Sequence, residues 1–255
     1  MAQGKFIDRT GEKGIMNCGI EVEIIRYKNN TDIDVLVLST GEVIQHRRYG
    51  DFKRGKIRPS NVKTIHGWGI IDCKAVDEYG KTLKSFDTWR SMIQRTKDLK
   101  FKEKNKAYKD ADCCDEWQYY SNFKKWYDES WYDVNTGDRM CLDKDILTKG
   151  NKLYSPETCI IVPEPINILF TYKRGLDNGL PCGIYYDKSR DKYVAQIQSN
   201  NKNMNLGRFN TPEEAFYTYK EAKEKEIKRV ADLYKDKIPQ KLYNAMYNYE
   251  IEITD

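Results

Sequence analysis

Histidine is scarce in this 255-residue sequence, which holds only His46 and His66. The seven cysteines contain no Cys-x-x-Cys pair, so the spacing typical of a zinc ribbon is absent. An odd number of cysteines without that spacing favours reduced thiols in a cytoplasmic protein over a disulfide framework. The first residues do not resemble a signal peptide, and no apolar run is long enough to span a bilayer, so we expect no membrane partner.

Charge and aromatic side chains are abundant instead. Charged residues make up 33% of the chain and aromatic residues 13%. A disordered chain rarely carries so many aromatic residues, so we expect compact units with a strongly polar surface.

Basic residues concentrate in two segments. Residues 44–63 hold seven basic residues against one acidic residue, and residues 173–208 hold seven against three. Two separate basic segments suit a polyphosphate partner better than a diffuse charge does. The alternative is that both segments are ordinary solvated faces.

Residues 17–60 have the pattern of short strands. Apolar and polar residues alternate in EVEIIRY and DIDVLVLS, and turn-forming residues follow at Asn29-Asn30 and at 39–42. This predicts a small antiparallel β-barrel in a first domain, residues 1–70.

Two segments that follow are typical of helices, residues 86–98 and 115–130. Aromatic and aliphatic residues recur there at helical spacing, which indicates a buried stripe. Asp87 and Asp115 are the expected N-caps. Core side chains are expected at Phe86, Trp89, Ile93, Trp117, Tyr120, Phe123 and Trp126.

Residues 139–170 predict a strand, a Gly-Asn turn, a second strand and a short helix opened by Pro163 and Pro165, a ββα pattern. After a polar linker, three short strands precede a long helix that begins at Pro212 behind Thr211 or Asn210 as cap. The fold class is therefore α+β and multidomain, with domains at 1–70, 71–171 and 172–255.

The run LDKDIL-x-KGNK-x-YSPETC-x-x-V-P-x-x-IN resembles the HNH, or ββα-metal, nucleases of phages. The preceding helices resemble the tryptophan-rich lead-in of the same proteins, so the resemblance covers residues 86–170. It implies one divalent ion, Mg or Mn, held by Asp143 and Asn167.

The resemblance also implies a base, and here the sequence departs from the family. Lys144 stands where the family has histidine, and a lysine is ordinarily protonated and cannot accept a proton. Lys144 could act if burial or the metal deprotonated it. It could instead clamp the phosphate while Asp145 or solvent takes the proton, or the site could be inactive. Asp145, two residues from Asp143, is expected on the same strand face.

Residues 183–220 resemble the three-strand-plus-helix domain of plant ethylene-response factors, which also occurs in phage integrases and homing endonucleases. The resemblance implies that the sheet enters the major groove of DNA. Which face of the strand 192–198 meets DNA is left open by the sequence. The candidate DNA contacts are Tyr185, Lys188, Arg190, Lys192, Tyr193, Gln196, Lys202 and Arg208.

The N-terminal β-unit, with Tyr49, Phe52, Gly55 and Ile57 in the pattern Y-x-x-F-x-x-G-x-I, resembles a small domain fused ahead of phage HNH cores. Its basic loop is a candidate backbone-binding patch. The residues of this loop are Arg47, Arg48, Lys53, Arg54, Lys56 and Arg58.

Three functions follow from these patterns. The first is a metal-dependent endonuclease of homing or mobile phage type, acting on double-stranded DNA in the cytoplasm of a phage-infected bacterium. The second is a degenerate HNH protein that binds DNA as a phage regulator or anti-defence factor. The third is a protein-interaction module whose basic patches meet an acidic partner; a dimer is compatible with all three.

Overall fold

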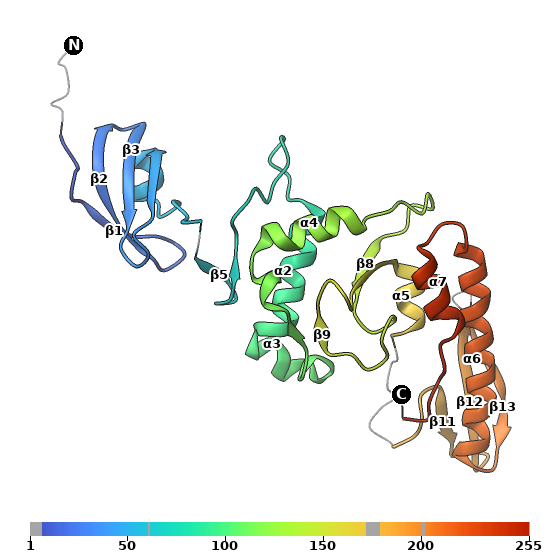
Figure 1. The fold of residues 1–255 in the computed structure, drawn as a ribbon. Coiled ribbons are helices and arrows are strands. Elements are labelled where there is room, and N and C mark those ends of the chain that lie inside the picture. The colour runs from blue at the N-terminus through green and yellow to red at the C-terminus, as the bar shows by residue number, and fades with distance from the viewer. Residues whose placement is uncertain (1–6, 61, 172–178, 200–201, 255) are drawn as a thin grey trace. The chain divides into compact units, whose positions relative to one another are not determined.

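The computed structural model describes residues 7–60, 62–171, 179–199 and 202–254 (Figure 1). The chain is mixed α/β and forms two compact units, residues 1–125 and 126–255.

The first unit opens with a four-stranded antiparallel sheet in the order β1-β2-β3-β4, followed by helix α1. The bounds are β1 Lys13–Ile15, β2 Glu21–Asn29, β3 Asp32–Val37, β4 Val43–Arg47 and α1 Tyr49–Lys53. The inward residues of the sheet form a buried core with Phe52 of α1. Gly14 makes room for that ring, since a Cβ there would lie 3.0 Å from Phe52 Cζ.

The expected barrel is not closed among the described residues. The strands β1 and β4 are the two edges of the sheet and do not pair. A barrel needs its edge strands to meet through tilt and stagger. Here the β1 strand has only three residues, and α1 supplies the cover that a closing strand would give.

The rest of the first unit is helical, with short strands. Its elements are β5 Lys63–Ile65, β6 Gly69–Ile70, α2 Lys84–Lys97, α3 Leu99–Lys104, η1 Lys106–Tyr108, β7 Asp112–Cys113, η2 Asp115–Gln118 and α4 Tyr120–Ser130. The helix α4 extends past the boundary at residue 125.

The aromatic stripe predicted from sequence is confirmed as core. Trp89, Tyr120 and Phe123 are fully buried and Trp117 nearly so. Trp89 Nε1 donates a 2.7 Å hydrogen bond to the Trp117 carbonyl, which satisfies the one polar atom of that ring. Trp126 is only half-buried, and its neighbour Tyr127 is the buried residue.

The predicted caps of these helices are wrong. The helix α2 begins at Lys84, three residues before Asp87, and its N-cap Leu83 makes no side-chain cap bond. Asp87 pairs with Arg90 instead, at 2.9 Å. Asp115 begins the 3-10 helix η2, whereas α4 begins only at Tyr120.

The second unit begins with the predicted ββα pattern. Its elements are β8 Met140–Asp143, β9 Leu153–Tyr154, β10 Ile160–Pro163 and α5 Glu164–Leu169. The strands β8 and β10 are antiparallel, with Asp143 opposite Ile160. The helix α5 has Pro163 as N-cap and Pro165 in its first turn, as the sequence indicated.

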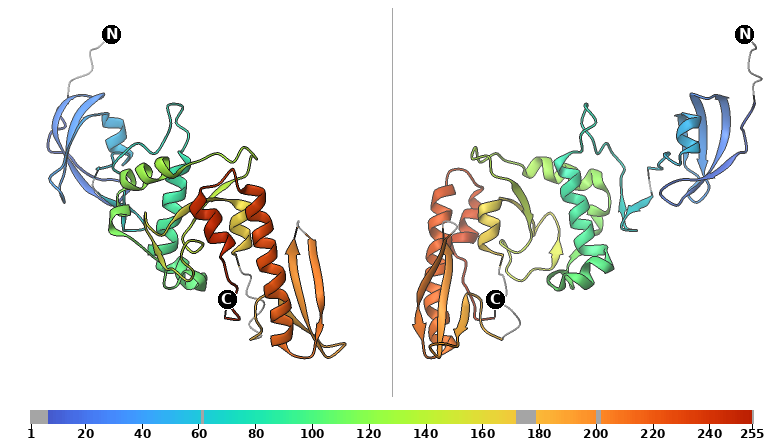
Figure 2. Two further views of the ribbon diagram at one scale, coloured as in Figure 1. Left: turned by 45° about the vertical axis from the view of Figure 1, so that its right-hand side comes forward. Right: turned by 180° about the vertical axis from the view of Figure 1, so that it is seen from behind.

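A three-stranded antiparallel sheet, β11-β12-β13, and two helices complete the unit. The bounds are β11 Ile184–Asp187, β12 Lys192–Ser199, β13 Lys202–Phe209, α6 Pro212–Tyr234 and α7 Gln240–Tyr247. Thr211 caps α6 by accepting a hydrogen bond from Glu214 N at 3.2 Å, so this predicted cap is confirmed. Figure 2 shows α6 running along one face of the sheet.

One hydrophobic core joins the ββα elements to this sheet and its helices. It includes Val162 and Ile166 from the ββα segment, Ala195 from β12, and Phe216 and Ile227 from α6. The core therefore lies on both sides of residue 171, where the sequence analysis placed a domain boundary. The division of the chain into three functional modules, residues 1–70, 71–171 and 172–255, stays a prediction.

Candidate nucleic-acid interface and ββα site

Asp143 ends the strand β8, at the position that the HNH resemblance gives to a metal ligand. Its Oδ1 accepts hydrogen bonds from the backbone N–H groups of Asp145 at 2.7 Å and Ile146 at 2.8 Å. Burial raises the pKa of the Asp143 carboxyl above its ordinary value, and the two backbone bonds offset part of that rise. A cation beside this carboxylate would relieve the cost of burying its charge.

Lys144 is buried, with 7% of its side chain exposed. Its Nζ donates to Asp145 Oδ1 at 2.5 Å and to the Asn151 carbonyl at 2.7 Å, and lies 5.7 Å from the centroid of the Tyr154 ring. Each of these neighbours stabilises a protonated ammonium. Lys144 is therefore suited to stabilise the fold as a charged side chain, and it is not suited to accept a proton as a general base.

Asp145 lies outside the strand that was expected to align it with Asp143. Since β8 ends at Asp143, the period-two argument does not extend to residue 145. The Asp145 N–H instead turns back onto the Asp143 carboxylate, an Asx-type turn. The Asp145 side chain is 48% exposed and is the acidic group of this site most open to solvent.

Asn167 lies on α5, which packs against β8, and its side chain is half-buried. The two ligands implied by the resemblance therefore come from neighbouring elements. Carboxylate and amide oxygens are a donor set that suits Mg or Mn. Asn151 serves the turn, as its Nδ2 donates to the carbonyls of Lys144 and Leu153.

The two histidines belong to the first unit. His66 Nδ1 lies 3.0 Å from Asp98 Oδ2. His46 Nδ1 lies 2.9 Å from Asp32 Oδ1, and its backbone N–H donates to Asp34 Oδ1. Both histidines thus have carboxylate neighbours of their own.

Asp32, Asp34 and His46 form a cluster that could hold a metal ion, because their ligand atoms lie within 4.8 Å of one another. Arg26 already bridges the two carboxylates, with contacts of 2.5 Å to Asp34 and 3.0 Å to Asp32. The Arg26 hydrogen bond lowers the pKa of Asp34 to about 2. A fixed guanidinium thus already neutralises charge that a metal ion would neutralise.

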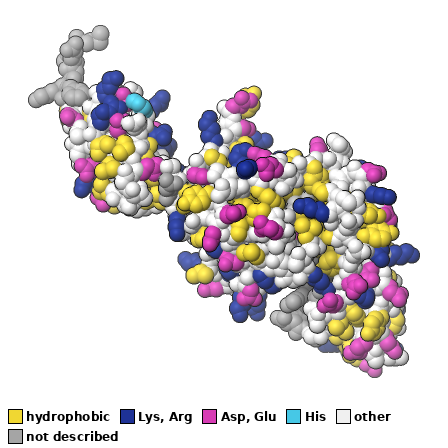
Figure 3. Space-filling model, in the orientation of Figure 1, with side chains coloured by type: hydrophobic (Ala, Val, Ile, Leu, Met, Phe, Trp, Pro, Cys, Tyr) yellow, Lys and Arg dark blue, Asp and Glu magenta, His cyan; other side chains and the backbone are white. Residues whose placement is uncertain are grey.

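The six basic residues of the N-terminal loop are all exposed. Two of them have acidic partners, since Lys53 pairs with Glu12 at 3.1 Å and Arg54 with Asp51 at 2.8 Å. The other four form no ion pair with described residues; they are Arg47, Arg48, Lys56 and Arg58. Figure 3 shows Lys and Arg side chains gathered at one end of this β-unit.

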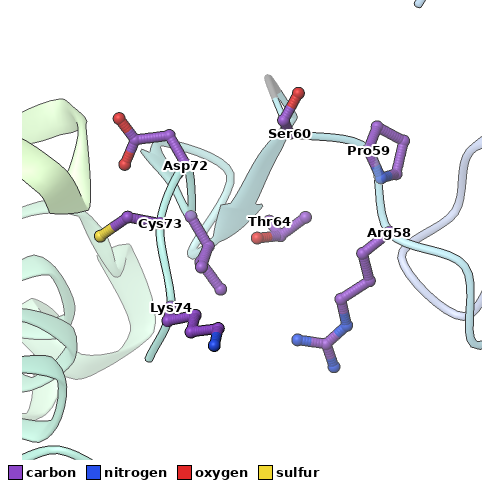
Figure 4. A pocket seen from close by; sticks show the side chains of 8 residues that line it. Arg58, Pro59, Ser60, Thr64, Asp72, Cys73 and Lys74 are labelled. Carbon is purple, nitrogen blue, oxygen red and sulfur yellow. The ribbon is translucent and has the colours of Figure 1, made fainter. Parts of the chain in front are cut away.

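A pocket of about 270 Å³ lies beside the end of the basic loop (Figure 4). Arg58 and Lys74 line it together with Ser60 and Thr64. Lys74 adds a cation that sequence reasoning missed, because it lies 16 positions after Arg58 along the chain. The two cations offer hydrogen-bond donors to a phosphate oxygen. The Asp72 carboxylate also lines the pocket and accepts from Ser121, and the Ser60 hydroxyl already donates to Glu42.

The structure decides which face of the C-terminal sheet is open. Ala195 and Ile197 are buried, and Ser199 Oγ donates to Glu226 Oε1 of α6 at 2.9 Å. Side chains alternate along a strand, so residues 195, 197 and 199 face the helix and residues 192, 194, 196 and 198 face the other way.

Antiparallel partners share a face, so the open face can be read from the register. Tyr185, Val194 and Arg208 form one row across the three strands, and Asp187 lies beside Lys192. Gln196 pairs with Asn205 and Gln198 with Asn203. Sequence reasoning did not select Gln198, Asn203 and Asn205 as DNA contacts. Polar residues on a strand indicate an exposed face, but the sequence does not show which residues lie opposite one another on neighbouring strands.

Tyr193 lies on the helix side, as does Lys202, which pairs with Ser199 at the end of the hairpin. Tyr193 pairs with Tyr186 and Phe209, and its ring lies 5.1 Å from that of Tyr186. Tyr185 is its exposed counterpart on the open face, with 43% exposure.

The cations around the open face differ in their partners. Arg190 and Arg208 share the carboxylate of Asp187, at 3.1 Å and 3.8 Å. The Lys192 ammonium donates to Asn210 Oδ1. Lys188, in the β11–β12 turn, is exposed and forms no ion pair with described residues. Lys202 is likewise exposed and forms no ion pair with described residues, but it stands at the end of the hairpin opposite Ser199, on the helix side.

Comparison of the chain with family models, curated proteins and solved structures found no match. The resemblances to HNH nucleases and to ethylene-response-factor domains therefore rest on this chain's own residues. Among the described residues, no helix is both long and apolar enough to cross a membrane.

Proposed function

We propose that this chain binds double-stranded DNA with a preference for sequence, through the open face of the β11–β13 sheet. The observation that carries the proposal is the composition of that face. Its outward positions hold Tyr185, the cations Arg208 and Lys192, one acidic residue, Asp187, four amides, and one buried aliphatic residue, Val194. A polar, basic sheet face of this kind suits base edges and phosphates, and offers little apolar area to a protein partner.

Charge supports the same partner. Lys188 and Lys202 are uncompensated by described residues, and Arg190 with Arg208 place two guanidinium groups on one carboxylate. The N-terminal basic loop, with Arg58 and Lys74 at its pocket, supplies further cations. Each phosphate that is neutralised adds to a salt-dependent affinity, because counterions are released.

A duplex mobility-shift assay over a range of salt concentrations tests this proposal. Lys188→Ala should weaken binding, and the slope of log affinity against log salt should fall by about one for a lost phosphate contact. Lys241→Ala is the matched control, since Lys241 is an exposed lysine on α7, away from the sheet face. An affinity for duplex that does not depend on salt would contradict the proposal and favour the protein-interaction module.

Metal-dependent cleavage of the DNA is a second candidate, favoured by one observation. Asp143 at the end of β8 and Asn167 on the adjoining α5 stand on the elements from which the HNH resemblance draws its metal ligands. Mg or Mn bound there would stabilise charge that develops on a scissile phosphate. Lys144 does not suit the role of base, which leaves the half-exposed Asp145 or solvent to take the proton.

The cleavage candidate is tested with supercoiled plasmid and phage genomic DNA in Mg or Mn, beside Asp143→Asn. Asparagine keeps an oxygen for the two backbone N–H groups but removes the charge a cation needs. Cleavage by the native protein alone would establish the nuclease. Salt-dependent binding with no cleavage by either protein would leave a DNA-binding regulator or anti-defence factor as the function.

A further inference from the structure

The β12–β13 hairpin extends beyond the strand that flanks it. The partner residues of β11 on β12 end at Ala195, whereas β12 continues to Ser199 and pairs with β13 down to Lys202. The outer half of the hairpin is therefore a two-stranded ribbon. A register shift at Ala195/Gln196 separates this ribbon from the three-stranded part of the sheet.

The open face of this ribbon carries only amides. Gln196 lies opposite Asn205, and Gln198 lies opposite Asn203. Gln198, Asn203 and Asn205 are exposed and Gln196 is half-buried. The side chains of Gln196, Gln198 and Asn203 form no hydrogen bond with other described residues, while Asn205 Oδ1 accepts from the Gly207 N–H at 2.9 Å.

A carboxamide has an acceptor and a donor side by side, and this pair matches N6 and N7 of adenine in the major groove. Guanine offers two acceptors there, and arginine or lysine suits it better. The cations of this domain lie elsewhere on the sheet: Arg208 in the three-stranded part, Lys188 in the β11–β12 turn and Lys202 at the far end of the ribbon. Amides and charges are thus separated along the sheet.

The dimensions of the ribbon fit a groove. Two strands about 4.8 Å apart fit within a major groove about 12 Å wide, which admits a two-stranded β-ribbon. The Gln196–Asn205 and Gln198–Asn203 rows lie two residues apart, about 6.6 Å along the strand. This is close to two base-pair steps of about 3.4 Å.

We propose that Gln196, Gln198 and Asn203 read adenine in the major groove, so that the preferred duplex carries two A·T pairs separated by about two base-pair steps. The inference rests on the proposed DNA binding and adds the base that the site selects. Lys202 at the far end of the ribbon and Arg208 in the three-stranded part contact phosphates, and the amides determine which bases are preferred.

Selection of bound sites from a random duplex library, using the full chain, tests the reading. The native protein should enrich adenine at two nearby positions. Gln198→Leu combined with Asn203→Leu should lower discrimination at one of them by about tenfold, the value of one bidentate contact near 1.4 kcal/mol. Gln240→Leu is the matched control, because Gln240 is an exposed glutamine on α7. Both mutated positions are exposed, and a thermal melt checks that the variant is folded.

A selected site with 7-deazaadenine at one of the two positions probes the contact itself, because this base lacks the N7 acceptor. The substitution should weaken binding of the native protein about tenfold. At the position that Gln198 and Asn203 contact, it should not change the affinity of the double leucine variant, which has already lost that contact. Duplex binding without adenine enrichment, or unaltered selectivity in the variant, would overturn the amide reading and leave the proposed DNA binding intact. Absence of duplex binding would overturn both.

Discussion

Lys144 and Asn151 form two reciprocal hydrogen bonds across the turn that follows β8. The Lys144 ammonium donates to the Asn151 carbonyl at 2.7 Å, and Asn151 Nδ2 donates to the Lys144 carbonyl at 2.9 Å. The residue that stands in place of the family's histidine is thereby part of the turn that shapes the ββα unit. This reciprocal contact gives Lys144 a structural role that can be separated from catalysis.

Lys144→Met should lower the free energy of unfolding by about 1–3 kcal/mol, because the Asn151 carbonyl loses its buried donor. Chemical denaturation measures the change. Lys152→Met is the control, since Lys152 is an exposed lysine in the same turn. Equal stability of the Lys144 variant and the native protein would show that the contact does not stabilise the turn.

Asp143 should make stability fall as pH rises. Burial raises the pKa of the Asp143 carboxyl above its ordinary value near 3.8, so the folded chain holds this proton at a pH where the unfolded chain releases it. Between those two pKa values the native protein loses stability with increasing pH. Asp143→Asn removes the effect, so its stability relative to native should rise across this window, as measured by denaturation at several pH values. A constant difference would contradict the assignment.

Arg26 should stabilise the first unit at neutral pH, and this stabilisation should decrease as the pH falls, the opposite of the trend expected for Asp143. Its hydrogen bond lowers the pKa of Asp34 to about 2, so this stabilisation is present above the ordinary value of 3.8 and is lost as pH falls toward 2. Arg26→Gln should therefore be less stable than native near neutral pH, and the difference should shrink in acid. Thermal melts at pH 7 and pH 3 compare the two. Lys56→Gln is the control, since Lys56 is an exposed lysine of the same unit that forms no ion pair with described residues.

Thr211→Ala should destabilise the second unit by about 1 kcal/mol, because the Glu214 N–H loses its side-chain acceptor at the start of α6. Thr218→Ala lies inside the same helix and should be neutral or slightly stabilising, since its hydroxyl bonds only to the Glu214 carbonyl one turn earlier. Denaturant midpoints distinguish the two. Equal effects would mean that the cap contributes nothing beyond helix propensity.

Local patterns in the sequence determined much of the secondary structure. The spacing of Trp89 and Phe123 predicted their burial, Thr211 before Pro212 predicted a cap, and Pro163 with Pro165 predicted a short helix. These rules act over one or two turns of chain, so they need no knowledge of the fold. The predicted N-cap at Asp87 was wrong. The helix α2 begins three residues earlier, at Lys84, where Ser85 and Phe86 are buried and no side chain caps the helix.

Only the tertiary structure decided the arrangement of the two candidate sites. The Asn151 carbonyl and the Tyr154 ring that contact Lys144 lie seven and ten residues further along the chain, so the folded structure was needed to place them there, and the burial of Lys144 depends on packing. The open face of the sheet is defined by α6, which packs against the opposite face. The register shift at Ala195/Gln196 sets Gln196 opposite Asn205 instead of Leu206. Such a shift depends on how both strands pack against α6, and a one-residue slip would turn the amides toward the core.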